Sequence, residues 1–179
     1  IGVYPEDGLD VSSLTRNTET AMYQAKDAGR NNFKYFTAGM NEAMFARMEL
    51  EQRLRRAVAQ NEFALHYQPI VDMQTGVVCS VEALIRWQDP DFGLIPPDQF
   101  IPLAEETGLI EPMGEWVLNQ AMHDLRQWQK SGLKINVAIN VSGRQCINTR
   151  GMGFDQVLQE CFNRHHVNPR NVHIEITES

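Results

Sequence analysis

Three residues with oxygen-bearing side chains, Glu82, Asn140 and Glu175, stand in stretches that otherwise read as half-apolar strands. They are 58 and 35 residues apart, distances that fit whole strand–helix units, and Asn140 and Glu175 come late in their strands. In a barrel of strands and helices such groups converge at the carboxyl rim, where their oxygens suit Mg²⁺ or Mn²⁺. The same spacing also fits three side chains on a solvated sheet face, so both interpretations stay open.

Two further polar residues share the predicted strand faces. Arg86 lies four residues beyond Glu82. Its guanidinium could hold a phosphate through two parallel hydrogen bonds, or it could pair with Glu82. Gln68 could hydrogen-bond a base or a phosphate, although glutamines on strand faces are often only solvated. Because the sequence lacks the glycine-rich phosphate loops, the nucleophile elbow and the zinc-protease motif, these polar residues are its main chemical signal.

The elements that must position these residues alternate along the chain after residue 62. Because side chains alternate across a strand, each strand-like stretch divides into an apolar and a polar face. We predict strands at 63–70, 77–87, 135–142 and 172–178, and helices at 97–106, 111–131 and 153–165. Helices between strands favour parallel βαβ units. The first two strands are separated only by DMQTG, so the first strand should run antiparallel to the second.

The sequence of residues 1–60 predicts a different organisation. Residues 1–38 read as a small αβ unit, with a helix capped by Ser12 or Ser13, a turn at Gly29 and a short strand in NNFKYF. Residues 39–60 contain no proline and are rich in Met, Leu, Ala, Glu and Arg, which favours a connecting helix.

Composition excludes several classes of protein. The net charge of -7 argues against a binder of nucleic-acid polymers, because such binding depends on Lys and Arg. Three cysteines without C-x-x-C spacing indicate neither a disulfide framework nor a zinc knuckle, and fit the reduced cytosol. No apolar run approaches the length of about 18 residues that a membrane span needs. We expect a cytoplasmic segment without membrane contact, cut from a longer parent that could be anchored elsewhere.

Four ordered motifs carry a resemblance to a known family. They are YQPIVDMQTGVVCSVEALIRW, PPDQFIPLAEETGLI, NVS at 140–142 and HIEITES. From about residue 45 to 179 the sequence resembles the first half of an EAL domain, the bacterial phosphodiesterase that opens cyclic di-GMP to linear pGpG. The segments YPEDG and NTETAMYQAKDAGRN resemble the end of a GGDEF (diguanylate cyclase) domain, with Glu19 where that family usually has Asp.

The resemblance implies roles for particular residues. The Glu of the EAL motif, the Asn of NVS and the first Glu of EITE are metal ligands in the family, which implies Glu82, Asn140 and Glu175. The Gln of YQP and the Arg after EAL contact the cyclic dinucleotide, which implies Gln68 and Arg86. In the GGDEF segment, Lys26 and Arg30 would contact nucleotide phosphate, although surface solvation is the simpler interpretation of this stretch alone.

The resemblance also implies an architecture and an activity. We expect a partial TIM-like (βα) barrel of the EAL type with its first strand antiparallel, preceded by a small αβ remnant of a GGDEF domain. The predicted divisions are 1–38 for that remnant, 39–60 for the connecting helix and 61–179 for the truncated EAL half. The family hydrolyses cyclic di-GMP with Mg²⁺ or Mn²⁺, and its homodimers form through the EAL domain. No catalytic residue beyond the metal ligands is expected within 1–179, and the alternative is a catalytically inactive cyclic di-GMP receptor.

Overall fold

The computed structural model describes residues 1–147 and 153–177, which belong to two compact units, Ile1–Gln52 and Arg53–Ser179. The first unit contains α1 (Val11–Asp27) and the beginning of α2 (Ala38–Gln60). Asp10 caps α1 by accepting a hydrogen bond from the main-chain nitrogen of Ser13 at 2.8 Å, and Ser13 completes the capping box. The predicted cap at Ser12 or Ser13 is therefore wrong by two or three residues.

The predicted strand in NNFKYF is also wrong. Residues 33–37 have no regular secondary structure. The backbone there bonds to Ile1, through Phe36 N to Ile1 O at 2.8 Å and Ile1 N to Lys34 O at 2.6 Å. Two bonds to one residue do not make a ladder, and the side chains of Phe33 and Tyr35 are exposed.

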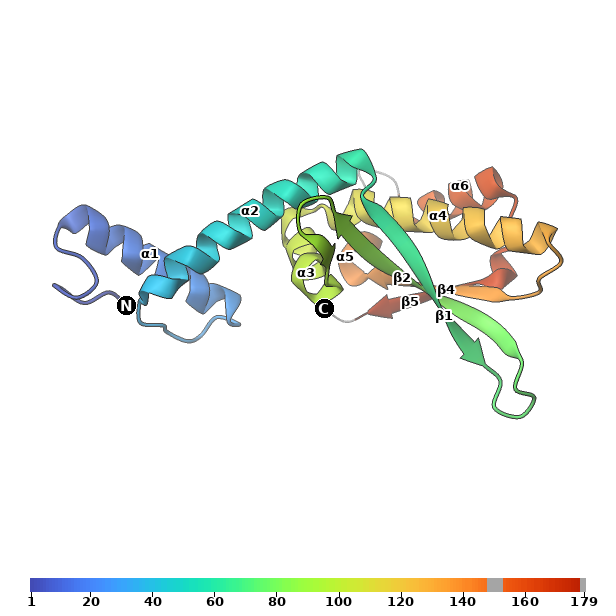
Figure 1. Cartoon of the computed structure of the whole chain (residues 1–179), viewed down its shortest axis with the longest axis horizontal. Helices are drawn as coiled ribbons and strands as arrows, with labels where there is room; N and C mark the ends of the chain where they lie inside the picture. The colour runs from blue at the N-terminus through green and yellow to red at the C-terminus, as the bar shows by residue number, and fades with distance from the viewer. Residues whose placement is uncertain (148–152, 178–179) are drawn as a thin grey trace. The chain divides into compact units, whose positions relative to one another are not determined.

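The second unit is built around one sheet. Its strands are β1 (Phe63–Val71), β2 (Val78–Asp89), β3 (Gly93–Ile95), β4 (Asn136–Ser142) and β5 (Val172–Thr177). The order is β1-β2-β4-β5, with β3 paired to β2 (Figure 1). β1 and β3 run antiparallel to β2, whereas β2–β4 and β4–β5 are parallel. The parallel pairs confirm the predicted βαβ units and rule out a purely antiparallel sheet.

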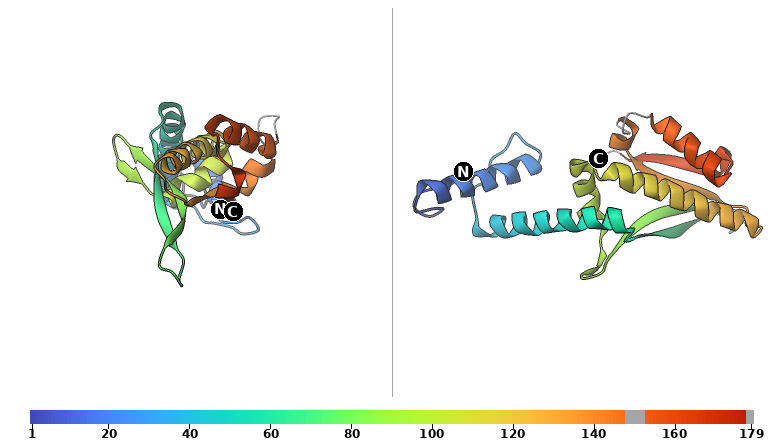
Figure 2. Two further views of the ribbon diagram at one scale, coloured as in Figure 1. Left: turned by 90° about the vertical axis from the view of Figure 1, so that its right-hand side faces the viewer. Right: turned by 90° about the horizontal axis from the view of Figure 1, so that it is seen from above.

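Helices connect the strands of this sheet. They are α3 (Pro97–Thr107), α4 (Ile110–Lys130), α5 (Gly143–Ile147), α6 (Phe154–His165) and a 3-10 turn (Pro169–Asn171). Gly108 adopts a φ of 74°, a left-handed conformation that ends α3 and lets α4 begin two residues later. Helices α4 and α6 pack against each other and lie on one side of the sheet (Figure 2). Among the described residues, no helix is long and apolar enough to cross a membrane.

The core lies between the apolar face of the sheet and these helices. The buried side chains come from β2, β4, α4, α6 and the loop before β5, and they are Val81, Ala83, Val117, Leu118, Ala121, Met122, Leu125, Val137, Ile139, Cys161 and Val167. Trp116 and Trp128 pack against this cluster. Burying one complete face fixes the register of the strands, because a slip of one residue would expose the whole apolar set.

The last turns of α2 are fastened to the sheet by a buried ion-pair network. Asp89, at the end of β2, has a side chain with 0% exposure and lies 3.6 Å from Arg53 and 3.4 Å from Arg56. Arg56 also bonds to Glu62, whose other carboxylate oxygen accepts from the indole of Trp87 at 3.2 Å. Burial opposes ionisation of Asp89, but the N–H groups of the following turn and the two guanidiniums outweigh it and lower its pKa.

Candidate functional site

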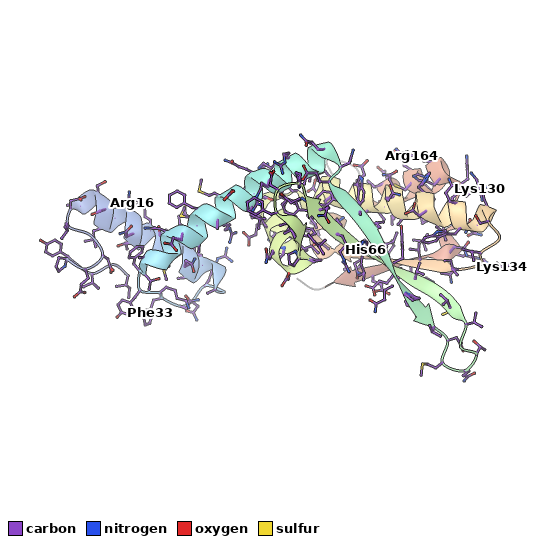
Figure 3. The ribbon with its side chains drawn as sticks, in the orientation of Figure 1. Arg16, Phe33, His66, Lys130, Lys134 and Arg164 are labelled. Atoms are coloured by element: carbon purple, nitrogen blue, oxygen red, sulfur yellow. The ribbon has the colours of Figure 1, made fainter. Side chains whose placement is uncertain are left out.

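The strand register brings the sequence-predicted polar residues onto one face. Gln68 on β1 lies opposite Glu82 on β2, Glu82 lies opposite Ala138 on β4, and Asn140 on β4 lies opposite Glu175 on β5. Residues two apart on a strand point the same way. The four polar side chains, those of Gln68, Glu82, Asn140 and Glu175, therefore project from the face that α4 and α6 do not cover. Figure 3 labels His66 on β1 on this face, with Arg164 on the helical side.

Glu82 and Asn140 are in direct contact. The side-chain nitrogen of Asn140 donates a hydrogen bond to Oε1 of Glu82 at 2.7 Å. Asn140 and Glu175 are exposed and Glu82 is half-buried. The contact leaves the second oxygen of the carboxylate and the oxygen of the amide available to a ligand.

The donor set suits a hard cation. Two carboxylates and an amide supply only oxygen ligands, which Mg²⁺ and Mn²⁺ prefer and which differ from the His and Cys ligands of zinc sites. Within residues 1–147 and 153–177, no group of three or more His, Cys, Asp and Glu side chains could hold a metal ion by itself. A cation at Glu82 would therefore depend on the Asn140 amide and on further ligands such as water or substrate oxygens.

Arg86 does not pair with Glu82 in the described part of the chain. Its Nη1 atom donates to the main-chain oxygen of Ile85 at 2.8 Å instead. The simpler of the two sequence interpretations, a Glu82–Arg86 ion pair, is therefore wrong. Arg86 lines a pocket of about 290 Å³ that also reaches Asn140 and the helices α3 and α4. Its guanidinium forms no ion pair with another described residue.

Sequence reasoning missed a polar cluster at the end of β4. The hydroxyl of Ser142 donates to Oε1 of Glu105 on α3 at 2.6 Å, and its main-chain nitrogen donates to Oε1 of Gln145 at 2.9 Å. Arg144 Nη1 donates to the main-chain oxygen of Glu105 at 2.8 Å. The sequence signal that could have found this cluster is weak, since Ser142 and Glu105 are 37 residues apart.

The opposite side of the sheet carries a polar contact that holds β1 in place. The hydroxyl of Tyr67 donates to Oδ2 of Asp124 on α4 at 2.6 Å, and the ring of Tyr67 lies 4.6 Å from that of Trp128. Burial and the neighbouring carboxylate raise the pKa of Tyr67, so the phenol stays protonated and keeps donating. This contact places Gln68, the next residue, on the polar face.

Lys26 and Arg30 belong to the first unit. Lys26, in the last turn of α1, lies 5.3 Å from the ring centre of Tyr23, and Arg30 has a left-handed backbone with a φ of 58°. Both side chains are exposed. Their predicted role as phosphate contacts stays a prediction.

Comparison with known proteins identifies the second unit. Residues 51–179 match the model of the EAL domain. Cyclic di-GMP phosphodiesterase PdeR of Escherichia coli is 43% identical over 161 residues, which are 89% of this chain and 24% of that protein. Bifunctional diguanylate cyclase/cyclic di-GMP phosphodiesterase MucR of Pseudomonas aeruginosa is 41% identical over 180 residues, 100% of this chain and 26% of that protein. The chain thus spans about a quarter of these curated relatives.

A solved structure shares the fold. The PaMucR phosphodiesterase in complex with c-di-GMP is 41% identical, covers 73% of this chain and 52% of its own, and gives a TM-score of 0.68. The predicted α/β fold, a partial barrel with an antiparallel first strand, is confirmed by this similarity and by the strand pairing.

Proposed function

Because this chain belongs to the EAL domain family, we propose that the whole protein is a phosphodiesterase that hydrolyses cyclic di-GMP to linear pGpG with the help of Mg²⁺ or Mn²⁺. The contact between Glu82 and Asn140, with Glu175 on the adjoining strand, is the observation that carries this proposal. The names of the two curated relatives support the substrate.

Each polar residue of the face has a part in the proposed reaction. The oxygens of Glu82, Asn140 and Glu175 would hold the cation. Such an ion polarises a phosphoryl oxygen and lowers the pKa of a bound water. Arg86 would hold a phosphate of the dinucleotide through its fork of N–H groups, and Gln68 would hydrogen-bond the same ligand from β1. The paired strands β1, β2, β4 and β5 keep these side chains in place before substrate arrives, which lowers the entropic cost of assembling the site.

We further propose the division into a GGDEF remnant at 1–38, a connecting helix at 39–60 and half of an EAL domain at 61–179. The separation of the chain into units at Gln52 and Arg53 supports a boundary inside the connecting helix. The match of the whole chain to a bifunctional cyclase and phosphodiesterase supports the GGDEF assignment, with Lys26 and Arg30 as its phosphate contacts. A cytoplasmic location and a homodimer through the EAL domain remain predictions.

The experiment is a hydrolysis assay on the whole protein. Cyclic di-GMP is incubated with MgCl₂, MnCl₂ or EDTA, and pGpG is separated by chromatography. We expect pGpG with either cation and none with EDTA. Glu82→Ala should abolish the product because it removes a ligand oxygen. The matched control is Ser80→Ala on the same strand, whose hydroxyl donates to the main-chain oxygen of Asn136.

Two results would overturn the proposed activity. Equal turnover by Glu82→Ala and the parent would remove Glu82 from the site. Saturable binding of cyclic di-GMP without any pGpG, with both cations, would favour the inactive receptor instead.

A further inference from the structure

The last residue of β4 is held by hydrogen bonds to two different helices. Ser142, the last residue of the strand, is 6% exposed, and Gln145 is 5% exposed. The hydroxyl of Ser142 donates to the Glu105 carboxylate at 2.6 Å, while its main-chain N–H donates to the Gln145 side chain at 2.9 Å. The bond to Glu105 is the stronger of the two, because hydrogen bonds to a carboxylate are shorter and stronger than neutral ones. Together with the neutral bond to Gln145, it fixes Ser142 to both α3 and α5.

A glycine in α4 provides the space for Gln145. A β-carbon at Gly114 would overlap the side-chain amide of Gln145. Glycine inside a helix costs about 1 kcal/mol relative to alanine. Gly114 therefore lowers the stability of α4 but leaves space for the side chain of Gln145, which accepts the hydrogen bond from Ser142.

Asn140 lies two residues before Ser142 and on the same face of β4. Asn140, Ser142, Gln145 and Glu105 all line the pocket that also contains Arg86. Because the amide of Asn140 reaches Glu82 at 2.7 Å, a small rotation of the strand end would break that contact. Pairing with β5 holds the strand along its length, and the Glu105–Ser142–Gln145 cluster holds its last residue.

We propose that Glu105, Ser142 and Gln145 are positioning residues that set the orientation of Asn140 toward Glu82 and the cation. The inference rests on the proposed function. These residues touch neither substrate nor cation in this role. They act through Asn140, as residues that orient metal ligands do in other metal sites.

The test measures cation binding separately from turnover. Free Mn²⁺ is titrated with the whole protein and followed by electron paramagnetic resonance without substrate, and kcat and KM for cyclic di-GMP are measured in parallel. Ser142→Ala and Gly114→Ala should each weaken Mn²⁺ binding about 10- to 100-fold and lower kcat, with little change in KM. Glu105→Ala removes the acceptor of the Ser142 hydroxyl and should weaken Mn²⁺ binding likewise, whereas Glu105→Gln keeps an uncharged acceptor and should lose less affinity.

A double variant separates positioning from general damage. In a Gln145→Ala background the overlap at Gly114 is gone, so Gly114→Ala should cause no further loss of Mn²⁺ affinity. Thr107→Ala is the matched control, since its hydroxyl bonds to Leu103 within α3 and lies outside the cluster. Thermal unfolding of every variant reports on folding.

The outcomes distinguish the two proposals. Unchanged Mn²⁺ affinity in Ser142→Ala and Gly114→Ala, with or without a lower unfolding temperature, would overturn the positioning role. Mn²⁺ binding by the parent without hydrolysis would overturn the proposed function alone, and the affinity losses in the variants would still support the positioning role.

Discussion

The side-chain nitrogen of Asn140 lies 2.7 Å from Oε1 of Glu82, although 58 residues separate them along the chain. The contact depends on the parallel pairing of β2 with β4, which sets Glu82 opposite Ala138 and leaves Asn140 two residues further toward the carboxyl end. Neither residue alone distinguishes a ligand from a solvated side chain. Their contact gives the polar face a defined geometry that substitutions can test.

Asn140→Asp should make stability depend on the cation. Without metal, two carboxylates would face each other and repel, so we expect a lower unfolding temperature in EDTA than for the parent. Mg²⁺ or Mn²⁺ should restore most of the loss by neutralising the pair. Differential scanning calorimetry in EDTA and in each cation checks this. Asn140→Ala is the control, and the same response to metal in both variants would contradict a ligand at position 140.

Arg86→Lys should weaken substrate binding more than turnover. Lysine keeps the charge but loses the planar fork, and a hydrogen bond to a charged group contributes about 1.5–3 kcal/mol. We expect KM for cyclic di-GMP to rise about tenfold or more, with kcat little changed. Steady-state kinetics measures both. The matched control is Lys134→Arg, which also keeps the charge, at an exposed site just before β4. Equal kinetics for parent and Arg86→Lys would argue against phosphate binding there.

Asp89→Asn should destabilise the second unit. Nε and Nη1 of Arg53 are buried and, among the described residues, have no hydrogen-bond partner, so the guanidinium depends on the charge of Asp89 at 3.6 Å and on the ring of Phe92 at 3.9 Å. Removing one partner of a buried ion pair costs on the order of 3 kcal/mol. Urea unfolding measures the loss.

The control for this substitution is Asp91→Asn. Its carboxylate is 64% exposed and lies 3.5 Å from Arg56. Exposed ion pairs contribute about 1 kcal/mol or less, so its effect should be small. A similar loss from both substitutions would show that burial of Asp89 does not decide the result.

His165 should make the unfolding free energy fall in mild acid. Burial, followed by the charges of His123, Arg164 and His166, lowers its pKa from 6.5 in the folded chain. The unfolded chain then binds the proton more tightly, so this contribution is complete above pH 6.5 and is lost as pH falls toward the folded pKa. Urea midpoints between about pH 7 and pH 5.5 should decline less in His165→Gln than in the parent. Identical slopes in the parent and in His165→Gln would contradict the assignment.

Much of the fold could be predicted because alternation and composition are local signals. The apolar faces of β2 and β4 are visible as every second residue, and burial against α4 and α6 is their physical cause. The same alternation predicted that Glu82 and Asn140 share a face, and the structure brings them into contact. Their role as ligands, and those of Gln68, Arg86 and Glu175, stay predictions.

The rest depends on contacts between residues distant in the chain. Glu105 lies in a correctly predicted helix, but its partner Ser142 is 37 residues away. α5 has five residues, too few to show a helical period, so the position of Gln145 could not be predicted. The three-residue β3 was missed for the same reason. For NNFKYF the sequence predicted a strand that does not form. Its residues favour strands, but without a long partner strand they remain irregular.

The fastening of α2 to Asp89 has a mechanical consequence. Asp89 ends the strand that carries Glu82 and, three residues before it, Arg86. Arg53 and Arg56, which pair with Asp89, lie in the last two turns of α2. A rotation of that helix about its axis would therefore displace the carboxyl end of β2. The last two turns of α2 are therefore tied, through Asp89, to the part of β2 that carries Arg86.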